Sequence, residues 1–146
     1  MEDKIKPAII KKKIIICDRF IDSTFAYQVF GKGVNKNLVN SVHKHILKGI
    51  KPNLTFVLRV KISKALKRLK ERKKKNRYDK FTKNFYNKVQ NAFLKIAKKD
   101  PKRYFVVDNS KDSKETEKII LNKFINALKK WINLMKILKL PLQRTS

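Results

Sequence analysis

A short apolar run that ends abruptly in charge is the feature that most constrains how this chain can fold. Three isoleucines and one cysteine occupy residues 14–17, and Asp18 and Arg19 follow directly. A continuous apolar run of this length is typical of a parallel strand that is buried on both faces. We therefore predict a strand over residues 14–18, with Cys17 buried in it. Ligands bind beyond the carboxyl ends of such strands, so Asp18 and Arg19 are candidates for holding a metal and a phosphate.

The spacing of apolar residues predicts that helices and strands alternate along the rest of the chain. The expected helices cover residues 2–12, 22–30, 35–48, a short segment capped by Ser63, 81–99, and a last helix that starts at Ser113. Two further strands are expected over residues 54–60 and 104–107. This alternation predicts an α/β fold with a parallel sheet. We expect one partial domain over residues 1–146, in which residues 132–146 form a possible tail extension.

Composition bounds the classes of function. The chain has 39 lysines and arginines against 11 acidic residues, a formal net charge of +28. Such a charge favours polyanions nonspecifically at low salt, but the lysines are spread along the chain, so we expect no specific nucleic-acid partner. Cys17 is the only cysteine, which excludes an internal disulfide and fits a cytoplasmic location. No apolar run is long enough to span a membrane, and the first residues lack the pattern of a signal peptide.

Several motifs, taken in order, resemble those of thymidylate kinases. The family's buried strand runs into Asp-Arg-Tyr/His/Phe and then Ser-x-x-Ala-Tyr-Gln, and residues 18–28 follow this pattern. Residues 31–33 read Gly-Lys-Gly where the family has Gly-Arg-Gly, and residues 51–55 are similar to its Arg/Lys-Pro-Asp-Leu-Thr. Residues 68–79 are similar to its arginine-rich lid. The resemblance extends from about Ile5 to Trp131 and implies the fold of the P-loop kinases, a parallel sheet flanked by helices.

The resemblance also implies a role for individual residues. Arg19 would bind the phosphate of the acceptor dTMP, Asp18 would help to order Mg²⁺, and Asn109 would border the adenine of ATP. The nucleoside contacts would come from four residues of one segment, namely Ser23, Thr24, Tyr27 and Gln28. The lid arginines Arg68, Arg72 and Arg77 would stabilise charge on the transferred phosphoryl group. One substitution stands out, because Arg59 occupies a position where the family commonly has an aspartate.

The phosphate-binding loop of a nucleotide kinase is not found in these residues. The chain has three glycines, Gly31, Gly33 and Gly49, and none begins the pattern G-x-x-x-x-G-K-[ST]. The resemblance therefore implies the C-terminal part of a kinase, without its first strands and phosphate loop, in a sheet left incomplete. We expect such a chain to be inactive alone. The alternatives are a non-catalytic remnant, one half of a split kinase that needs an N-terminal partner, and a basic nucleic-acid-binding module. The resemblance implies homodimerisation for the full-length kinase.

Overall fold

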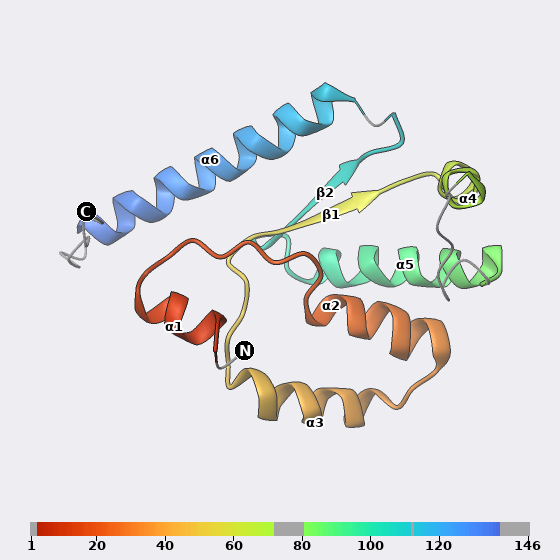
Figure 1. The fold of residues 1–146 in the computed structure, drawn as a ribbon, viewed down its shortest axis with the longest axis horizontal. Coiled ribbons are helices and arrows are strands. Elements are labelled where there is room, and N and C mark those ends of the chain that lie inside the picture. Colours follow the sequence, from red (N-terminus) through yellow and green to blue (C-terminus); the bar gives the residue numbers. More distant parts are fainter. Residues whose placement is uncertain (1–2, 72–80, 112, 138–146) are drawn as a thin grey trace. The chain divides into compact units, whose positions relative to one another are not determined.

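The computed structural model describes residues 3–71, 81–111 and 113–137, which divide into two compact units. The first unit comprises the described residues up to Asp18 together with those from Lys114 onward, and the second comprises residues 19–113. The first unit contains α1 (Ile5–Ile10) and the long helix α6 (Lys114–Ile137) (Figure 1). The second unit contains the sheet and the remaining elements, and most of the predicted site residues fall in it.

The sheet of the second unit has two parallel strands. β1 (Thr55–Arg59) pairs with β2 (Tyr104–Asp108), and the register places Thr55 opposite Tyr104 and Arg59 opposite Asp108. The rings of Phe56 and Phe105 meet edge to face across the pair, with their centroids 6.1 Å apart. The predicted α/β architecture is confirmed, because helices α4 (Ile62–Lys70) and α5 (Lys83–Lys99) provide the crossover between the two parallel strands (Figure 1).

The helical layer of the second unit is built around α5, which packs against both strands and against the segment that precedes α3 (Lys36–Leu47). That segment consists of α2 (Ile21–Thr24) and a π-helix, η1 (Phe25–Gly31). Its buried contact with α5 consists of Ala26 from η1 and Phe85, Val89 and Ala92 from α5. This cluster is the core on which the predicted nucleoside-binding segment rests.

Gly31 permits the close approach of η1 and α5. A Cβ atom at this position would lie 2.7 Å from Cε2 of Phe85, closer than real Cβ atoms come, and 3.2 Å from Cγ2 of Val89, which is tighter than most Cβ contacts. The absence of a side chain therefore sets the distance between the two helices. π-Helical turns are rare and occur frequently at functional sites, and η1 carries two of the predicted substrate-binding residues.

The predicted strand over residues 14–18 is wrong. Residues 13–17 form neither helix nor strand, Ile14 and Ile16 are 57% and 87% exposed, and Cys17 is exposed as well. A strand needs hydrogen-bond partners on a neighbouring strand. Among the residues that the structure describes, the sheet consists only of β1 and β2. The predicted cap of α4 is also wrong, because Lys61 precedes the helix and Ser63 lies inside its first turn.

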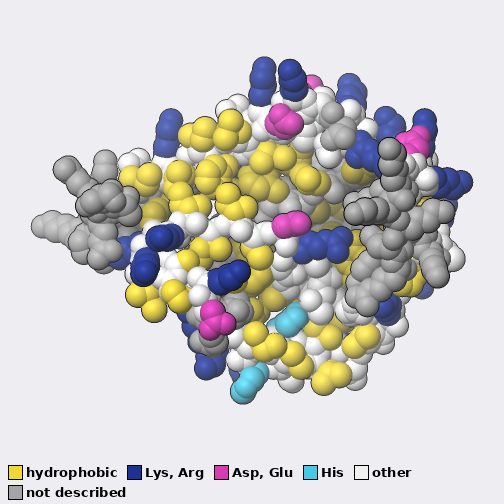
Figure 2. Space-filling view, in the orientation of Figure 1, with side chains coloured by type: hydrophobic (Ala, Val, Ile, Leu, Met, Phe, Trp, Pro, Cys, Tyr) yellow, Lys and Arg dark blue, Asp and Glu magenta, His cyan; other side chains and the backbone are white. Residues whose placement is uncertain are grey.

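Hydrophobic side chains remain visible over much of the face drawn in Figure 2, with lysines and arginines dispersed among them. On α3, Leu38, Val42 and Ile46 are 60%, 46% and 48% exposed at intervals of four residues. None of the helices described in the chain combines the length and the apolar character needed to cross a membrane.

Candidate functional site

Two predicted site residues, Arg19 and Tyr27, contact each other through their side chains. Arg19 precedes α2, and its Nη2 donates a hydrogen bond of 3.2 Å to the hydroxyl of Tyr27. The guanidinium carbon of Arg19 also lies 5.0 Å from the centroid of the Tyr27 ring, within the range of a cation–π contact. The structure therefore brings together a cation and an aromatic ring that the sequence separates by eight residues.

The backbone of Arg19 is strained. Its φ of 64° lies in the left-handed region, which non-glycine residues seldom occupy. Such a conformation costs on the order of 1–3 kcal/mol and is concentrated at ligand-binding and active sites. The side chain of Arg19 is exposed. A strained, exposed arginine beside an aromatic ring is suited to binding an anionic, ring-bearing ligand such as a nucleotide.

The Tyr27 ring also packs against two aromatic residues of α5. Its centroid lies 6.1 Å from that of Phe85 and 6.2 Å from that of Phe93, in tilted and edge-to-face arrangements. These geometries are favourable for aromatic pairs. Tyr27 thus links Arg19 to the core cluster, and the position of the arginine depends on how η1 packs against α5.

The other predicted nucleoside contacts lie on the same short helical segment. Ser23 and Thr24 end α2, and Gln28 belongs to η1; all three side chains are half-buried. The backbone carbonyl of Gln28 accepts a hydrogen bond of 2.9 Å from the backbone amide of Val34, just beyond the end of η1. These hydroxyl and amide groups offer both donors and acceptors, as recognition of a base or sugar requires.

Sequence reasoning missed a buried polar cluster next to Ser23. The two carboxylate oxygens of Asp22 accept hydrogen bonds from the Tyr104 hydroxyl at 2.7 Å and from Nη2 of Arg103 at 2.8 Å. Nε of Arg103 also donates to the Thr55 hydroxyl at 3.4 Å. An aspartate inside an otherwise apolar and hydroxyl-bearing helix was the available signal. Its partners lie more than 80 residues away in sequence, so the signal did not identify them.

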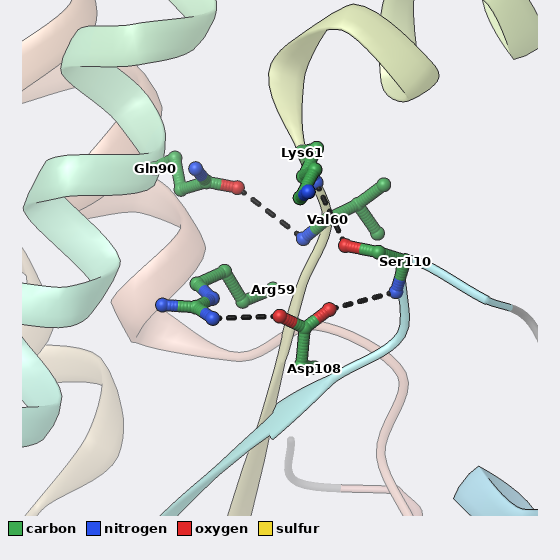
Figure 3. Close-up of polar contacts among 6 residues, drawn as sticks. All are labelled: Arg59, Val60, Lys61, Gln90, Asp108 and Ser110. Carbon is green, nitrogen blue, oxygen red and sulfur yellow. Dashed lines mark hydrogen bonds and ion pairs between the residues drawn. The ribbon is translucent and has the colours of Figure 1, made fainter.

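A second polar cluster lies at the carboxyl ends of β1 and β2 (Figure 3). Arg59 and Asp108 form an ion pair of 2.6 Å, and the amide of Ser110 donates to the other oxygen of Asp108 at 2.9 Å. Hydrogen bonds from Ser110 and Arg59 hold the pKa of the Asp108 carboxyl below its ordinary value of 3.8. The Ser110 hydroxyl accepts from the amide of Lys61 at 3.1 Å, so this cluster also fixes the start of α4.

The remaining predicted site residues are divided between these clusters and other parts of the chain. Asn109 lies between Asp108 and Ser110, and its backbone amide donates a hydrogen bond of 2.8 Å to the backbone carbonyl of Arg59. Arg68 is exposed on the last turn of α4, whereas Arg72 and Arg77 lie outside the described residues. Asp18 is exposed and belongs to the first unit. Among the described residues, no group of three or more histidine, cysteine or acidic side chains could hold a metal ion.

A lone carboxylate is nevertheless compatible with magnesium. Mg²⁺ is usually held by one or two carboxylates together with substrate phosphates and waters, rather than by a complete protein cage. Asp18 fits such a site as a single exposed carboxylate next in sequence to Arg19. In the second unit, Arg19 offers an exposed guanidinium, and residues 23–28 offer hydroxyl and amide groups beside it in sequence.

Comparisons with known proteins identify the family to which the chain is similar. A sequence profile of the thymidylate kinase family matches residues 1–120. The chain is 32% identical over 130 residues to the thymidylate kinase of Kosmotoga olearia, covering 89% of this chain and 62% of that protein. It is 46% identical over 108 residues to the thymidylate kinase of Wolbachia pipientis wMel, covering 73% of this chain and 53% of that protein. The chain thus spans between half and two thirds of these relatives.

A solved structure agrees with these matches. The crystal structure of thymidylate kinase from Ehrlichia chaffeensis aligns with a TM-score of 0.54 at 34% sequence identity, over 73% of this chain and 49% of that chain. Sequence and structure therefore lead to the same assignment. The chain belongs to the thymidylate kinase family.

Proposed function

We propose that this chain carries the acceptor-nucleotide part of a thymidylate kinase, which transfers the γ-phosphoryl group of ATP to dTMP and yields ADP and dTDP. The observation that carries the proposal is the pairing of Arg19 with Tyr27. A strained backbone holds the guanidinium beside the ring, at a distance of 3.2 Å from the hydroxyl. A monophosphate and its deoxyribose would engage these two side chains together.

Phosphoryl transfer requires positioning and positive charge rather than covalent help from the protein. An oxygen of the dTMP phosphate attacks the γ-phosphorus, and the bond from that phosphorus to the bridging oxygen of ADP breaks. We assign Arg19 to the acceptor phosphate, because a guanidinium can bind two phosphate oxygens at once. Tyr27 would contact the sugar. Ser23, Thr24 and Gln28 would make hydrogen bonds to the sugar or base.

The donor side of the reaction rests on other residues. Arg68, Arg72 and Arg77 would neutralise charge that develops on the transferred group, and Asn109 would border the adenine of ATP. Asp18 would bind Mg²⁺ through coordinated water. When bound, Mg²⁺ neutralises phosphate charge and orders the phosphates for transfer.

The reaction also needs a loop that cradles the ATP phosphates. The 146 residues contain no G-x-x-x-x-G-K-[ST] pattern. We therefore propose that turnover requires a segment outside these 146 residues that supplies the phosphate loop and its strand, and that these residues alone do not catalyse the reaction. We further propose that the assembled kinase is a cytoplasmic homodimer. A non-catalytic remnant is the alternative, in which dTMP binding persists or has been lost but no partner restores turnover.

Formation of dTDP and ADP, separated by chromatography, tests this proposal. The chain would be incubated with dTMP, ATP and Mg²⁺, alone and after co-expression with a polypeptide that carries the strand and the phosphate loop. The matched control is the same polypeptide with the loop lysine changed to alanine. We expect turnover only with the intact loop. Steady-state turnover by these residues alone would contradict the requirement for an added phosphate loop. Absence of turnover in every mixture would favour a non-catalytic remnant.

A further inference from the structure

We propose that Asp22, Arg103 and Tyr104 act as positioning residues, which hold the helical segment that carries the nucleoside contacts at the distance from the sheet that dTMP binding requires. The inference rests on the proposed function, because it assigns dTMP to the segment of residues 21–31. It concerns three side chains that would not touch the nucleotide themselves.

The cluster is buried and satisfies both oxygens of one carboxylate. The Tyr104 hydroxyl and Nη2 of Arg103 donate to different oxygens of Asp22, at 2.7 and 2.8 Å. The side chains of Arg103 and Asp22 are 15% and 13% exposed. The Arg103 guanidinium carbon also lies 4.5 Å from the centroid of the Tyr104 ring. A buried pair with this geometry is costly to break, because removal of one partner leaves an uncompensated charge.

The cluster connects two parts of the second unit that are distant in sequence. Asp22 lies in the first turn of α2, whereas Tyr104 is the first residue of β2 and Arg103 precedes it. Arg103 also bonds to the hydroxyl of Thr55, the first residue of β1 and the register partner of Tyr104. A single carboxylate therefore ties the start of α2 to the beginning of both strands.

The segment that follows Asp22 is thus held at both of its ends. Ser23 is the next residue, and Tyr27 lies farther along the same segment, packed against Phe85 and Phe93 of α5. Loss of the Asp22 contacts would leave the segment attached through the packing of η1 against α5. The segment could then pivot about those contacts, and the Ser23 hydroxyl would no longer keep a fixed position relative to the sheet for a ligand.

Tyr104 is suited to a permanent donor role. Burial raises the pKa of its hydroxyl above the ordinary value of 10.0, and the hydrogen bond to Asp22 raises it further. The hydroxyl therefore keeps its proton throughout the neutral range. Replacement of this tyrosine by phenylalanine removes one donor while it preserves the ring and its contact with Arg103, so Tyr104→Phe is the cleanest variant of the cluster.

Amide hydrogen exchange on the full chain tests the inference independently of ligand binding. For each protein, the measured quantity is a ratio: the mean exchange rate of residues 21–28 divided by the mean exchange rate of residues 86–96 in α5. We expect Tyr104→Phe to raise this ratio about tenfold, because the lost bond anchors one region and not the other. Asp22→Asn should act in the same direction. The matched control is Ala97→Gly, which weakens α5 near its end and should not raise the ratio. Equal acceleration of both regions in Tyr104→Phe would overturn the inference.

Titration with dTMP then connects the cluster to the site. The dissociation constant for dTMP should rise about tenfold in Tyr104→Phe and stay within about twofold in Ala97→Gly. Unchanged affinity in Tyr104→Phe would overturn the positioning role even if the segment loosens. If the unaltered chain binds no dTMP at all, the proposed function fails in its binding part, whereas the exchange ratio still decides whether the cluster positions the segment.

Discussion

Two neighbouring stretches of this chain show that local hydrophobicity alone does not determine which residues form regular structure and become buried. Residues 14–17 are apolar but form no regular structure, and Ile16 is 87% exposed. Residues 21–31 are more polar, yet they form α2 and η1, and Ala26 in this segment is 0% exposed. The more hydrophobic stretch is therefore the less buried one.

The difference arises from where backbone hydrogen bonds are made. A helix satisfies its own amide and carbonyl groups, so residues 21–31 need only one apolar surface, which α5 provides. A strand satisfies these groups only on a neighbour. Unpaired strands with apolar side chains are sites at which another chain can pair. Residues 14–17 thus have the composition of a buried strand, but the sheet in the described part of the chain consists of β1 and β2 and does not include them.

Truncation of the core on which residues 21–31 pack should give the largest contrast with a substitution in residues 13–17. Phe85 is 8% exposed and stacks on Phe81 at 4.0 Å while it supports Tyr27. Phe85→Ala should lower the free energy of unfolding by about 3–5 kcal/mol, as for other buried aromatic residues. Ile16→Ser should change it by less than about 0.5 kcal/mol, because the side chain is exposed. Urea unfolding of both variants checks this, and a large loss in Ile16→Ser would show that residues 13–17 are packed.

Removal of the Arg19 side chain should have the next largest effect, on ligand affinity. Arg19→Ala should weaken dTMP binding about 100-fold, because charge-assisted hydrogen bonds to a phosphate are lost. Thymidine, which has no phosphate, should lose far less affinity. The matched control is Lys36→Ala, which removes one exposed positive charge at the start of α3. Equal weakening for dTMP and thymidine in calorimetric titrations would exclude a phosphate-binding role for Arg19.

A methyl group at Gly31 should test the close packing of the helical segment. Its Cβ would lie 2.7 Å from the Phe85 ring, so Gly31→Ala should destabilise the protein by about 1–3 kcal/mol, as overpacking does elsewhere. Asn40→Ala, at an exposed position of α3, is the control and should have little effect or be slightly stabilising. An unchanged melting temperature in Gly31→Ala would mean that η1 and α5 do not approach as closely as described.

The smallest effect is expected at the strand ends and depends on pH. Hydrogen bonds lower the folded-state pKa of Asp108 below 3.8, so its contribution to stability is complete above that pH and is lost as the pH falls further. The protein should therefore lose more stability than Asp108→Asn between about pH 5 and about pH 3. Urea unfolding at both values measures the difference. Parallel losses in the two proteins would show that Asp108 makes no such hydrogen bonds.

The sequence predicts much of the fold where the determinants are local. Asn35 was expected to cap a helix, and its Oδ1 accepts hydrogen bonds from the amides of Asn37 and Leu38 at 2.8 and 3.2 Å. The strands β1 and β2 and the helix α5 lie close to their predicted ranges. The π-turn of η1 was not predicted, because it depends on how Gly31 meets a helix that begins some 50 residues later in the chain.

The contacts within the candidate site were likewise predictable only where they are local in sequence. Arg19 and Tyr27 were identified from one short motif, and they do contact each other. Asp22 was missed because its role depends on Arg103 and Tyr104, which are distant in sequence. Arg59 was noted as a reversal of charge, but its partner Asp108 could be found only after the register of the two strands was known. Whether residues 13–17 form a strand depends on a neighbouring strand, which no local sequence pattern specifies.

The most direct test of the account is titration of the full chain with dTMP, followed by amide chemical shifts residue by residue. We predict saturable binding that shifts the amide signals of residues 19–31, while those of residues 13–17 keep their positions. Absence of saturable binding, or shifts that spare residues 19–31, would contradict the claim that this segment is the acceptor-nucleotide site.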